Sequence, residues 1–180
     1  MRKKLLSGLV FFGVLASLLA VSMVFARGPH GQAGKSNIAH LYLYEKDPST
    51  WEIVEDGAWG KMKYNLAGSE FEFVFNGHGL QSDTEYALIY YVDQENPFVN
   101  WGKIGAVIST GISNKGGNIH LAGSVDIGSI PYEEDLNFGD GAKIWLILSS
   151  DYSGLQMTGW HPTEYLFEHN LITFGDTDVP

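Results

Sequence analysis

The sequence contains no cysteine. A fold built from it can form no disulfide, so it must be stabilised by packing or by a bound metal. The same absence excludes thiolate metal sites, blue-copper centres and cysteine nucleophiles.

Basic residues are scarce as well. There are 11 Lys and Arg against 21 Asp and Glu, which gives a formal net charge of −10. Proteins that bind nucleic acid need a clustered basic face for the phosphates, so nucleic acid is excluded as an expected partner. The acidic balance favours solubility and leaves cation binding open.

The sequence contains only one long apolar run. The uncharged residues 5–25 follow the basic residues 2–4 and precede the small residue Ala26, an order typical of a secretion signal. We expect residues 1–26 to be a signal peptide, and the protein to be secreted or displayed at the cell surface. Cleavage there would leave 8 basic and 21 acidic residues, a net charge of −13. Without cleavage the run would be a membrane anchor, and it is the only membrane contact expected.

The rest of the chain divides into two parts. Residues 27–37 are rich in glycine and polar residues without periodicity, which indicates a flexible leader. Residues 38–178 have the size of one domain, since domains typically hold about 100 to 150 residues. We therefore expect a single domain there.

Alternation of apolar and polar residues with period two recurs along this domain, and no window has apolar residues at helical spacing. This pattern predicts an all-β fold. The expected strands are 38–45, 51–54, 58–66, 70–75, 86–92, 104–113, 118–127, 142–149 and 165–174. About nine strands separated by polar turns favour an antiparallel β-sandwich of the immunoglobulin or fibronectin type.

The faces of two predicted strands can be assigned. Phe71, Phe73 and Phe75 lie two residues apart, so they share one face of a half-buried strand. Lys61 and Lys63 likewise share one face of the strand 58–66, which must therefore have a solvated side.

The segment from Leu80 to Tyr86 reads LQSDTEY and opens a predicted strand. It resembles the tyrosine corner of fibronectin type III domains. The resemblance implies that the ring of Tyr86 packs inward, while its hydroxyl satisfies a backbone group upstream and fixes a strand that changes sheets. Leu80 and Tyr86 are thus expected to be structural.

A wider resemblance covers most of the predicted domain. It is carried by GAKIWLILSSDYSG at 141–154, GWHPTEYLFEHNLITFGDTD at 159–178, FNGHGL and EYALIYY. These segments look like those of a family of uncharacterised secreted all-β proteins from archaea and bacteria. The resemblance supports the domain and implies no activity.

The sequence offers two kinds of candidate metal site. The candidate histidines His78, His120 and His161 lack the close spacing of metal motifs, so only the fold could assemble a site from them. A calcium site is the stronger hypothesis. Its candidate ligands are Asp135, Asn137 and Asp140, but one extra residue breaks the match to known calcium loops and no glutamate follows at the expected distance, so the segment is also typical of a solvated acidic turn.

Catalysis has less support. The chain has no G-x-S-x-G motif, and residues 149–151 read as an ordinary loop start. Glu164 and Glu168 are flanked by aromatic residues, where burial would raise a carboxyl pKa, and two carboxylates about 5 to 10 Å apart could hydrolyse glycosides. No long insertion marks an active-site loop, so we expect a protein that is not an enzyme and needs no cofactor.

Aromatic residues supply the remaining hypothesis. Trp51, Trp59 and Trp145 are expected in the core, whereas Trp101 and Trp160 lie in loops and could stack on a sugar ring or pack over the domain's ends. The sequence therefore predicts an exported, non-catalytic binding or interaction domain with an extracellular protein or glycan as partner. The alternative is a carbohydrate-binding or carbohydrate-active protein.

Overall fold

The computed structural model describes residues 36–91, 105–127, 134–135, 139–154 and 156–178. Its eight long-range strands are β1 (Ile38–Tyr44), β2 (Trp59–Asn65), β4 (Phe71–His78), β5 (Glu85–Tyr91), β6 (Gly105–Ile112), β7 (Ile119–Val125), β10 (Lys143–Leu148) and β13 (Leu166–Glu168). The shorter elements are β3 (Ala67–Gly68), β8 (Glu134–Asp135), β9 (Gly139–Asp140), β11 (Tyr152–Ser153), β12 (Gln156–Met157), β14 (Gly175–Asp176) and the 3-10 helices η1 (Ser149–Asp151) and η2 (Pro162–Glu164). Among the described residues, no helix is long and apolar enough to cross a membrane.

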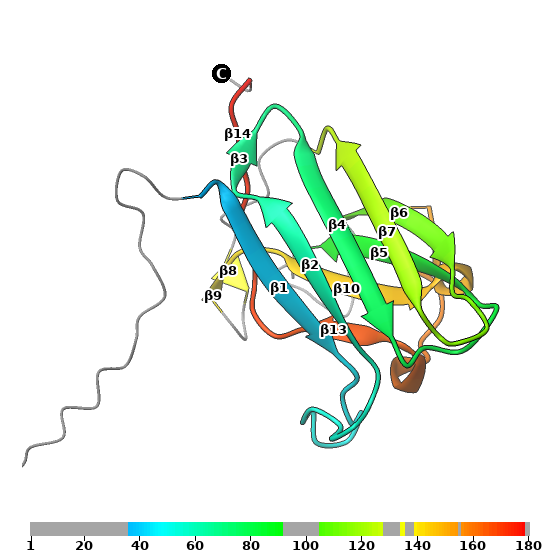
Figure 1. Ribbon diagram of the computed structural model, residues 1–180. Helices are drawn as coiled ribbons and strands as arrows, with labels where there is room; N and C mark the ends of the chain where they lie inside the picture. Colours follow the sequence, from blue (N-terminus) through cyan, green and yellow to red (C-terminus); the bar gives the residue numbers. More distant parts are fainter. Residues whose placement is uncertain (1–35, 92–104, 128–133, 136–138, 155, 179–180) are drawn as a thin grey trace, which may run out of the picture. The chain divides into compact units, whose positions relative to one another are not determined.

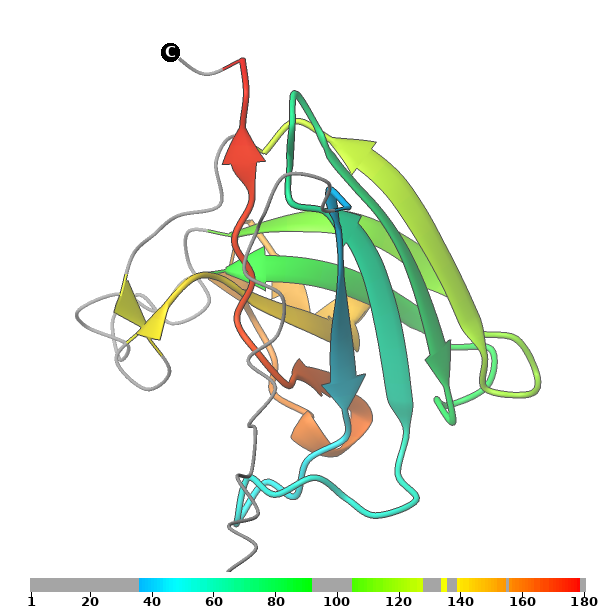
Figure 2. The same ribbon diagram turned by 60° about the vertical axis from the view of Figure 1, so that its left-hand side comes forward.

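The eight strands form one antiparallel sheet in the order β6-β5-β10-β13-β1-β2-β4-β7. In Figure 1, β1, β2, β4 and β7 run side by side and the other four strands cross behind them. Figure 2 shows the two halves curving around a shared interior. The sheet is therefore nearly closed into a barrel-like shape.

The interior is filled by alternate residues of the strands. Phe73 and Phe75 on β4 are 4% and 0% exposed, as their sequence pattern predicts. The rings have room because glycine lies opposite them: a Cβ on Gly60 would stand 2.3 Å from Phe75 Cζ, and one on Gly123 would stand 2.9 Å from Phe73 Cε1. Large aromatic residues and glycine thus pack as complementary shapes inside the barrel.

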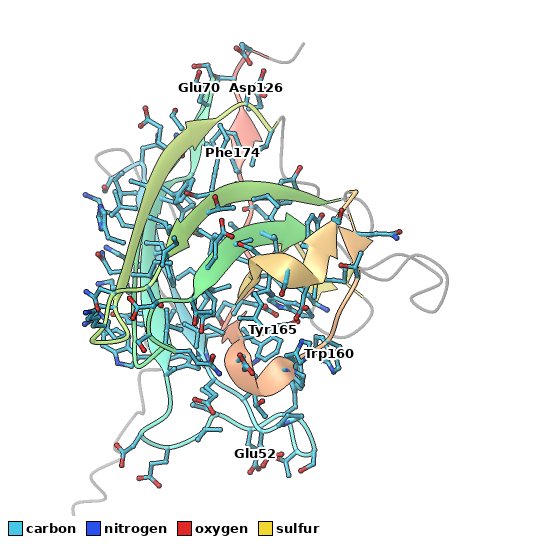
Figure 3. All side chains as sticks on the ribbon, turned by 90° about the vertical axis from the view of Figure 1, so that its right-hand side faces the viewer. Glu52, Glu70, Asp126, Trp160, Tyr165 and Phe174 are labelled. Atoms are coloured by element: carbon cyan, nitrogen blue, oxygen red, sulfur yellow. The ribbon has the colours of Figure 1, made fainter. Side chains whose placement is uncertain are left out.

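Part of the sheet is covered on its outer face as well. Residues 149–154 and 156–165, which we call the cap, pack against the outer face of β5, β10 and β13. A second core lies beneath the cap and consists of Ala87, Ile89, Trp145, Ile147, Met157, Tyr165 and Phe167. Figure 3 shows Tyr165 in the cap, at the end of the barrel opposite Phe174. Strand β10 is consequently buried on both faces, which explains its continuous apolar sequence.

The two edge strands, β6 and β7, are consecutive in the chain and joined by a tight turn. The connection between β4 and β5 is tied to this turn, because the backbone N–H of Leu80 donates to the carbonyl oxygen of Gly117 at 3.0 Å. The buried Ser113 also binds the carbonyl oxygen of Gln81 through its hydroxyl. Backbone and side-chain contacts therefore hold one end of the barrel together.

The predicted all-β, antiparallel architecture is confirmed, but the strands do not form a two-layer sandwich. The difference arises at the run 165–174, of which only Leu166–Glu168 is a main-sheet strand. This short strand pairs with β10 on one side and with β1 on the other, so it merges two halves into one curved sheet. The run 51–54 is not a strand either; Ile53 forms a single bridge with Lys46.

Candidate functional site

Three aromatic side chains face outward from adjacent strands. Tyr42 and Tyr44 on β1 lie with ring centroids 6.2 Å apart and planes 12° from parallel. Trp59 on β2 is paired with Tyr44 in the sheet, and its indole is 41% exposed. The prediction that Trp59 belongs to the core is therefore wrong, because the alternation of β2 places it on the solvated face.

The three rings line an open groove of about 550 Å³. Its other wall is the loop between β1 and β2, visible below the sheet in Figures 1 and 2. The loop contributes Ile53, Val54, Glu55, Asp56 and Gly57 to the lining. We call this hollow the β1–β2 groove. Its size and mixture of aromatic and polar groups suit a small ligand or one unit of a polymer.

The loop that forms the groove is held in one conformation by many hydrogen bonds. The carboxylate of Asp47 accepts the backbone N–H groups of Ser49 and Thr50 at 2.7 and 3.2 Å. The carboxylate of Glu45 accepts the N–H of Ala58 at 2.9 Å, and Val54 donates back to the carbonyl of Glu45 at 3.0 Å. A groove with a fixed wall loses little conformational entropy when a ligand binds.

Beyond the rings, the same outer face carries hydrogen-bonding groups. In register with Tyr42 lie Lys61 on β2, Asn76 on β4 and His120 on β7. His120 Nδ1 and Asn76 Oδ1 are hydrogen-bonded at 2.8 Å, which orients the amide. Lys61 Nζ lies 5.3 Å from the centroid of the Tyr42 ring. Aromatic rings beside amide, imidazole and ammonium groups are the combination that recognises a polyhydroxylated ring.

A second exposed aromatic cluster lies at the cap and includes the predicted ligand-binding residue Trp160, which is 43% exposed. The Trp160 ring stacks on Trp51, with centroids 6.5 Å apart, and contacts Trp145 at 5.8 Å. Trp145 is buried as expected, but Trp51 is 36% exposed rather than in the core. Much of the Trp160 surface therefore serves to cover the second core.

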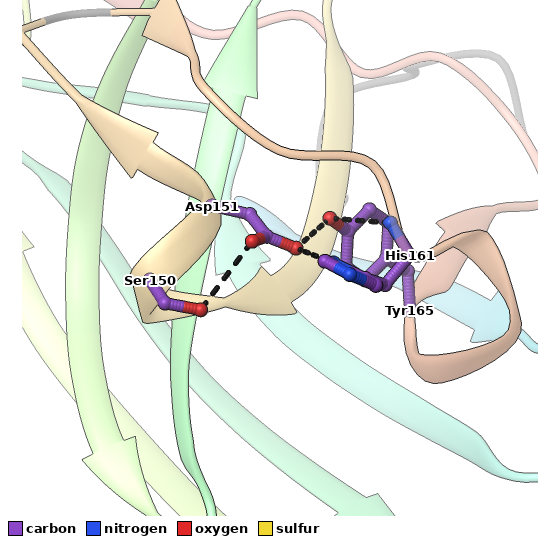
Figure 4. Close-up of polar contacts among 4 residues, drawn as sticks. All are labelled: Ser150, Asp151, His161 and Tyr165. Atoms are coloured by element: carbon purple, nitrogen blue, oxygen red, sulfur yellow. Dashed lines mark hydrogen bonds and ion pairs between the residues drawn. The ribbon is translucent and has the colours of Figure 1, made fainter.

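Figure 4 shows the polar cluster that fixes the cap. One carboxylate oxygen of the buried Asp151 accepts the Tyr165 hydroxyl and also lies 2.6 Å from His161 Nδ1. The other oxygen accepts the Ser150 hydroxyl at 3.3 Å, and the Asp151 carbonyl accepts the N–H of Thr158 at 2.8 Å. Asp151 thus joins the start of the cap to its end.

Burial and hydrogen bonding act in opposite directions on the pKa of Asp151 in this cluster. Burial alone would raise the pKa of Asp151, but the hydrogen bonds from Tyr165 and His161 outweigh it and lower that pKa. The same hydrogen bond to Asp151, with the carboxylate charge, raises the pKa of His161. Burial, followed by the bond to Asp151, raises the pKa of Tyr165. The pair is therefore most favourable as carboxylate and imidazolium.

An aspartate bound to histidine Nδ1 also occurs in catalytic triads, where a nucleophile faces Nε2. Here the Ser150 hydroxyl binds the opposite carboxylate oxygen instead of the imidazole. Within the described residues, no hydroxyl forms a hydrogen bond with His161 Nε2, and the sequence holds no cysteine. The geometry assigns the cluster the task of fastening the cap.

Glu168, one of the acids proposed from the sequence, is 6% exposed at the end of β13. Burial raises its pKa to about 7, and the positive charges of Lys46 and Lys143 oppose that shift. The ammonium of Lys46 donates to the Glu168 backbone carbonyl at 3.0 Å and lies 5.5 Å from the Trp51 ring centroid. Glu164, the other acid proposed, is half-buried in η2 and lines a separate hollow of about 50 Å³.

The remaining predicted residues have the following places. Tyr86 is 1% exposed and accepts the N–H of Gln81 through its hydroxyl at 3.2 Å, while Leu80 is 8% exposed beside it. Trp101 and Asn137 lie outside the described residues, and of Asp135 and Asp140 only the backbone, paired in β8 and β9, is described. The calcium hypothesis accordingly stays a prediction.

The three candidate histidines are not brought together. His78 Nδ1 pairs with Asn118 Oδ1 at 2.8 Å, His120 pairs with Asn76, and His161 pairs with Asp151 at the cap. Within the described ranges, no group of three His, Cys, Asp or Glu side chains is placed to hold a metal ion.

Comparison with models of known protein families, with curated proteins and with solved structures gives no match. The resemblance to secreted all-β proteins stays a prediction, and the interpretation of the site rests on this chain's own residues.

Proposed function

We propose that the protein is a non-catalytic binding domain that recognises carbohydrate in the β1–β2 groove. The observation that carries this proposal is the row of outward-facing rings, Tyr42, Tyr44 and Trp59, on a preformed surface. These three rings belong to neither hydrophobic core, and burying their exposed faces against the apolar face of a sugar ring would be favourable. The neighbouring Lys61, Asn76 and His120 would bind its hydroxyl groups.

We also propose that the domain acts outside the cytoplasm. This rests on the order of basic, apolar and small residues in 2–26. The test is to express the full chain in a bacterial host, isolate the protein from the periplasm or medium, and determine its N-terminal residue. A start at Arg27 is expected, whereas a full-length chain retained in the membrane would support the uncleaved anchor.

Binding can be tested with a panel of insoluble polysaccharides of different sugar composition, in a pull-down followed by titration with soluble fragments of whichever is bound. The variants are Trp59→Ala and Tyr44→Ala, each expected to weaken binding about tenfold or more, as for an aromatic anchor at the centre of a site. Thermal melting establishes that each variant is folded.

The matched control is Trp160→Ala, because Trp160 and Trp59 are similarly exposed, at 43% and 41%, but lie in different clusters. Unchanged binding by Trp160→Ala with loss in Trp59→Ala would support the groove. The opposite pattern would place the site at the cap, as the sequence alone suggested. Failure of the wild type to bind any member of the panel would overturn the carbohydrate proposal.

A further inference from the structure

The two walls of the β1–β2 groove differ in charge. The sheet wall presents the neutral rings of Tyr42, Tyr44 and Trp59, and the loop wall presents the carboxylates of Glu55 and Asp56. Both acids are exposed, and within the described residues neither has a hydrogen bond or ion pair through its side chain. The groove therefore combines aromatic faces with two available negative charges.

Among the described residues, those that line the groove include no lysine or arginine. Lys61 Nζ lies 5.3 Å from the centroid of the Tyr42 ring, while Trp59 and Tyr44 contact the imidazoles of His78 and His169 at 4.7 and 5.9 Å. On the acidic side, the Glu45 carboxylate already accepts the N–H of Ala58 and does not add to the free charge. The balance at the end lined by Trp59, Glu55 and Asp56 is thus negative.

Such an end suits a positively charged amine. An ammonium group is attracted to the face of an aromatic ring, most strongly to tryptophan, and pairs with carboxylates at the same time. The formal net charge of −10 on the whole chain would draw a polycation toward the protein and repel a polyanion.

The acidic wall also has an unusual backbone. Asp56 has φ of 60°, in the left-handed region that a non-glycine residue adopts at a cost. The next residue, Gly57, donates its N–H to the carbonyl of Val54 at 3.1 Å, so the turn is closed behind the two acids. The loop therefore holds Glu55 and Asp56 on the groove in a fixed turn.

We propose that the groove is selective for a glycan whose sugar rings bear free, positively charged amino groups. The ring stacks on Tyr44 and Trp59, and its ammonium group pairs with Glu55 or Asp56. This inference rests on the proposed carbohydrate function and deepens it, because it names the class of sugar.

The experiment compares three soluble oligosaccharides with the same linkage and length by isothermal titration calorimetry. They are a β-1,4-linked glucosamine oligomer with free amines, its N-acetylated form and the glucose oligomer. An oligolysine of equal charge is the fourth ligand. Titrations are run in low salt and in about 0.5 M salt, where exposed charge pairs are screened.

We expect the free-amine oligomer to bind about tenfold or more tightly than the other two sugars in low salt, and this preference to shrink in high salt. The double substitution Glu55→Gln, Asp56→Asn should remove the preference, so that the three sugars bind with similar affinity. Asparagine tolerates the left-handed backbone at position 56. The control Glu52→Gln, an exposed acid of the same loop outside the groove lining, should keep the preference.

The outcomes separate the two proposals. Equal binding of all three sugars, all lost in Trp59→Ala, would overturn the amine selectivity and leave the carbohydrate function standing. Oligolysine binding as tightly as the glucosamine oligomer would overturn sugar recognition, since the ring would then contribute nothing. A preference for amines that persists in the double variant would show that Glu55 and Asp56 do not bind the ammonium group.

Discussion

Replacing Glu168 with glutamine should make the protein's stability less dependent on pH. The carboxyl group is 6% exposed, and burial raises its pKa from 4.5 to about 7. The folded state therefore binds the proton more tightly than the unfolded state does. Stability from this group is complete below about pH 4.5, declines as the pH rises, and is fully lost above about pH 7.

The magnitude follows from the two pKa values. One pH unit corresponds to about 1.4 kcal/mol, so the interval from 4.5 to about 7 corresponds to about 3 kcal/mol of unfolding free energy. Glutamine has nearly the same shape as the protonated acid and cannot ionise. The difference in stability between Glu168→Gln and wild type should thus shift in favour of the variant by about 3 kcal/mol between acidic and neutral pH.

The assay is urea unfolding followed by tryptophan fluorescence at several pH values from 4.5 to 7.5. Taking the difference between the two proteins cancels the titration of Asp151, His161 and the other groups that do not interact with residue 168. Glu52→Gln, which alters an exposed acid, is the control and should give a constant difference. Parallel pH profiles for Glu168→Gln and wild type would refute the reasoning, because the carboxyl group would then not be held protonated by burial.

Two further predictions concern the cap and the barrel interior. Asp151→Asn should lower the free energy of unfolding by about 1 to 3 kcal/mol, because Tyr165 and His161 lose a charged acceptor. Urea unfolding should show the greatest loss between pH 3.8 and 6.5, the ordinary pKa values of the two groups. The loss should shrink as the pH rises through the raised pKa of His161 and the imidazole gives up its proton. A loss that does not vary with pH would contradict the ion pair. Gly60→Ala should cost about 1 to 3 kcal/mol through overpacking against Phe75, whereas Gly175→Ala, whose Cβ would stand 3.7 Å from Ala67 Cβ, should melt like wild type.

The sequence was sufficient for the strands but not for the way they assemble. Period-two alternation identifies buried faces, as the row Phe71, Phe73 and Phe75 shows, because burial acts on each strand locally. The order of the strands in the sheet depends on contacts between residues that are far apart in the chain. The three residues Leu166–Glu168 pair on both sides and convert two layers into one curved sheet, and no local pattern marks them as different from a longer strand.

Part of the candidate site could be predicted from the same alternation. Trp59 lies two residues before Lys61 and four before Lys63, so it belongs to the face of that strand that was predicted to be solvated. The prediction that it lies in the core rested only on its large apolar ring. The loop wall was not predictable in this way. Asp56 adopts a left-handed backbone, and the loop's position depends on side-chain hydrogen bonds from Glu45 and Asp47. Aromatic residues that alternate in phase with charged residues along a strand are therefore the sequence signal for this kind of groove. The acids that face them can be identified only from the folded structure of the loop.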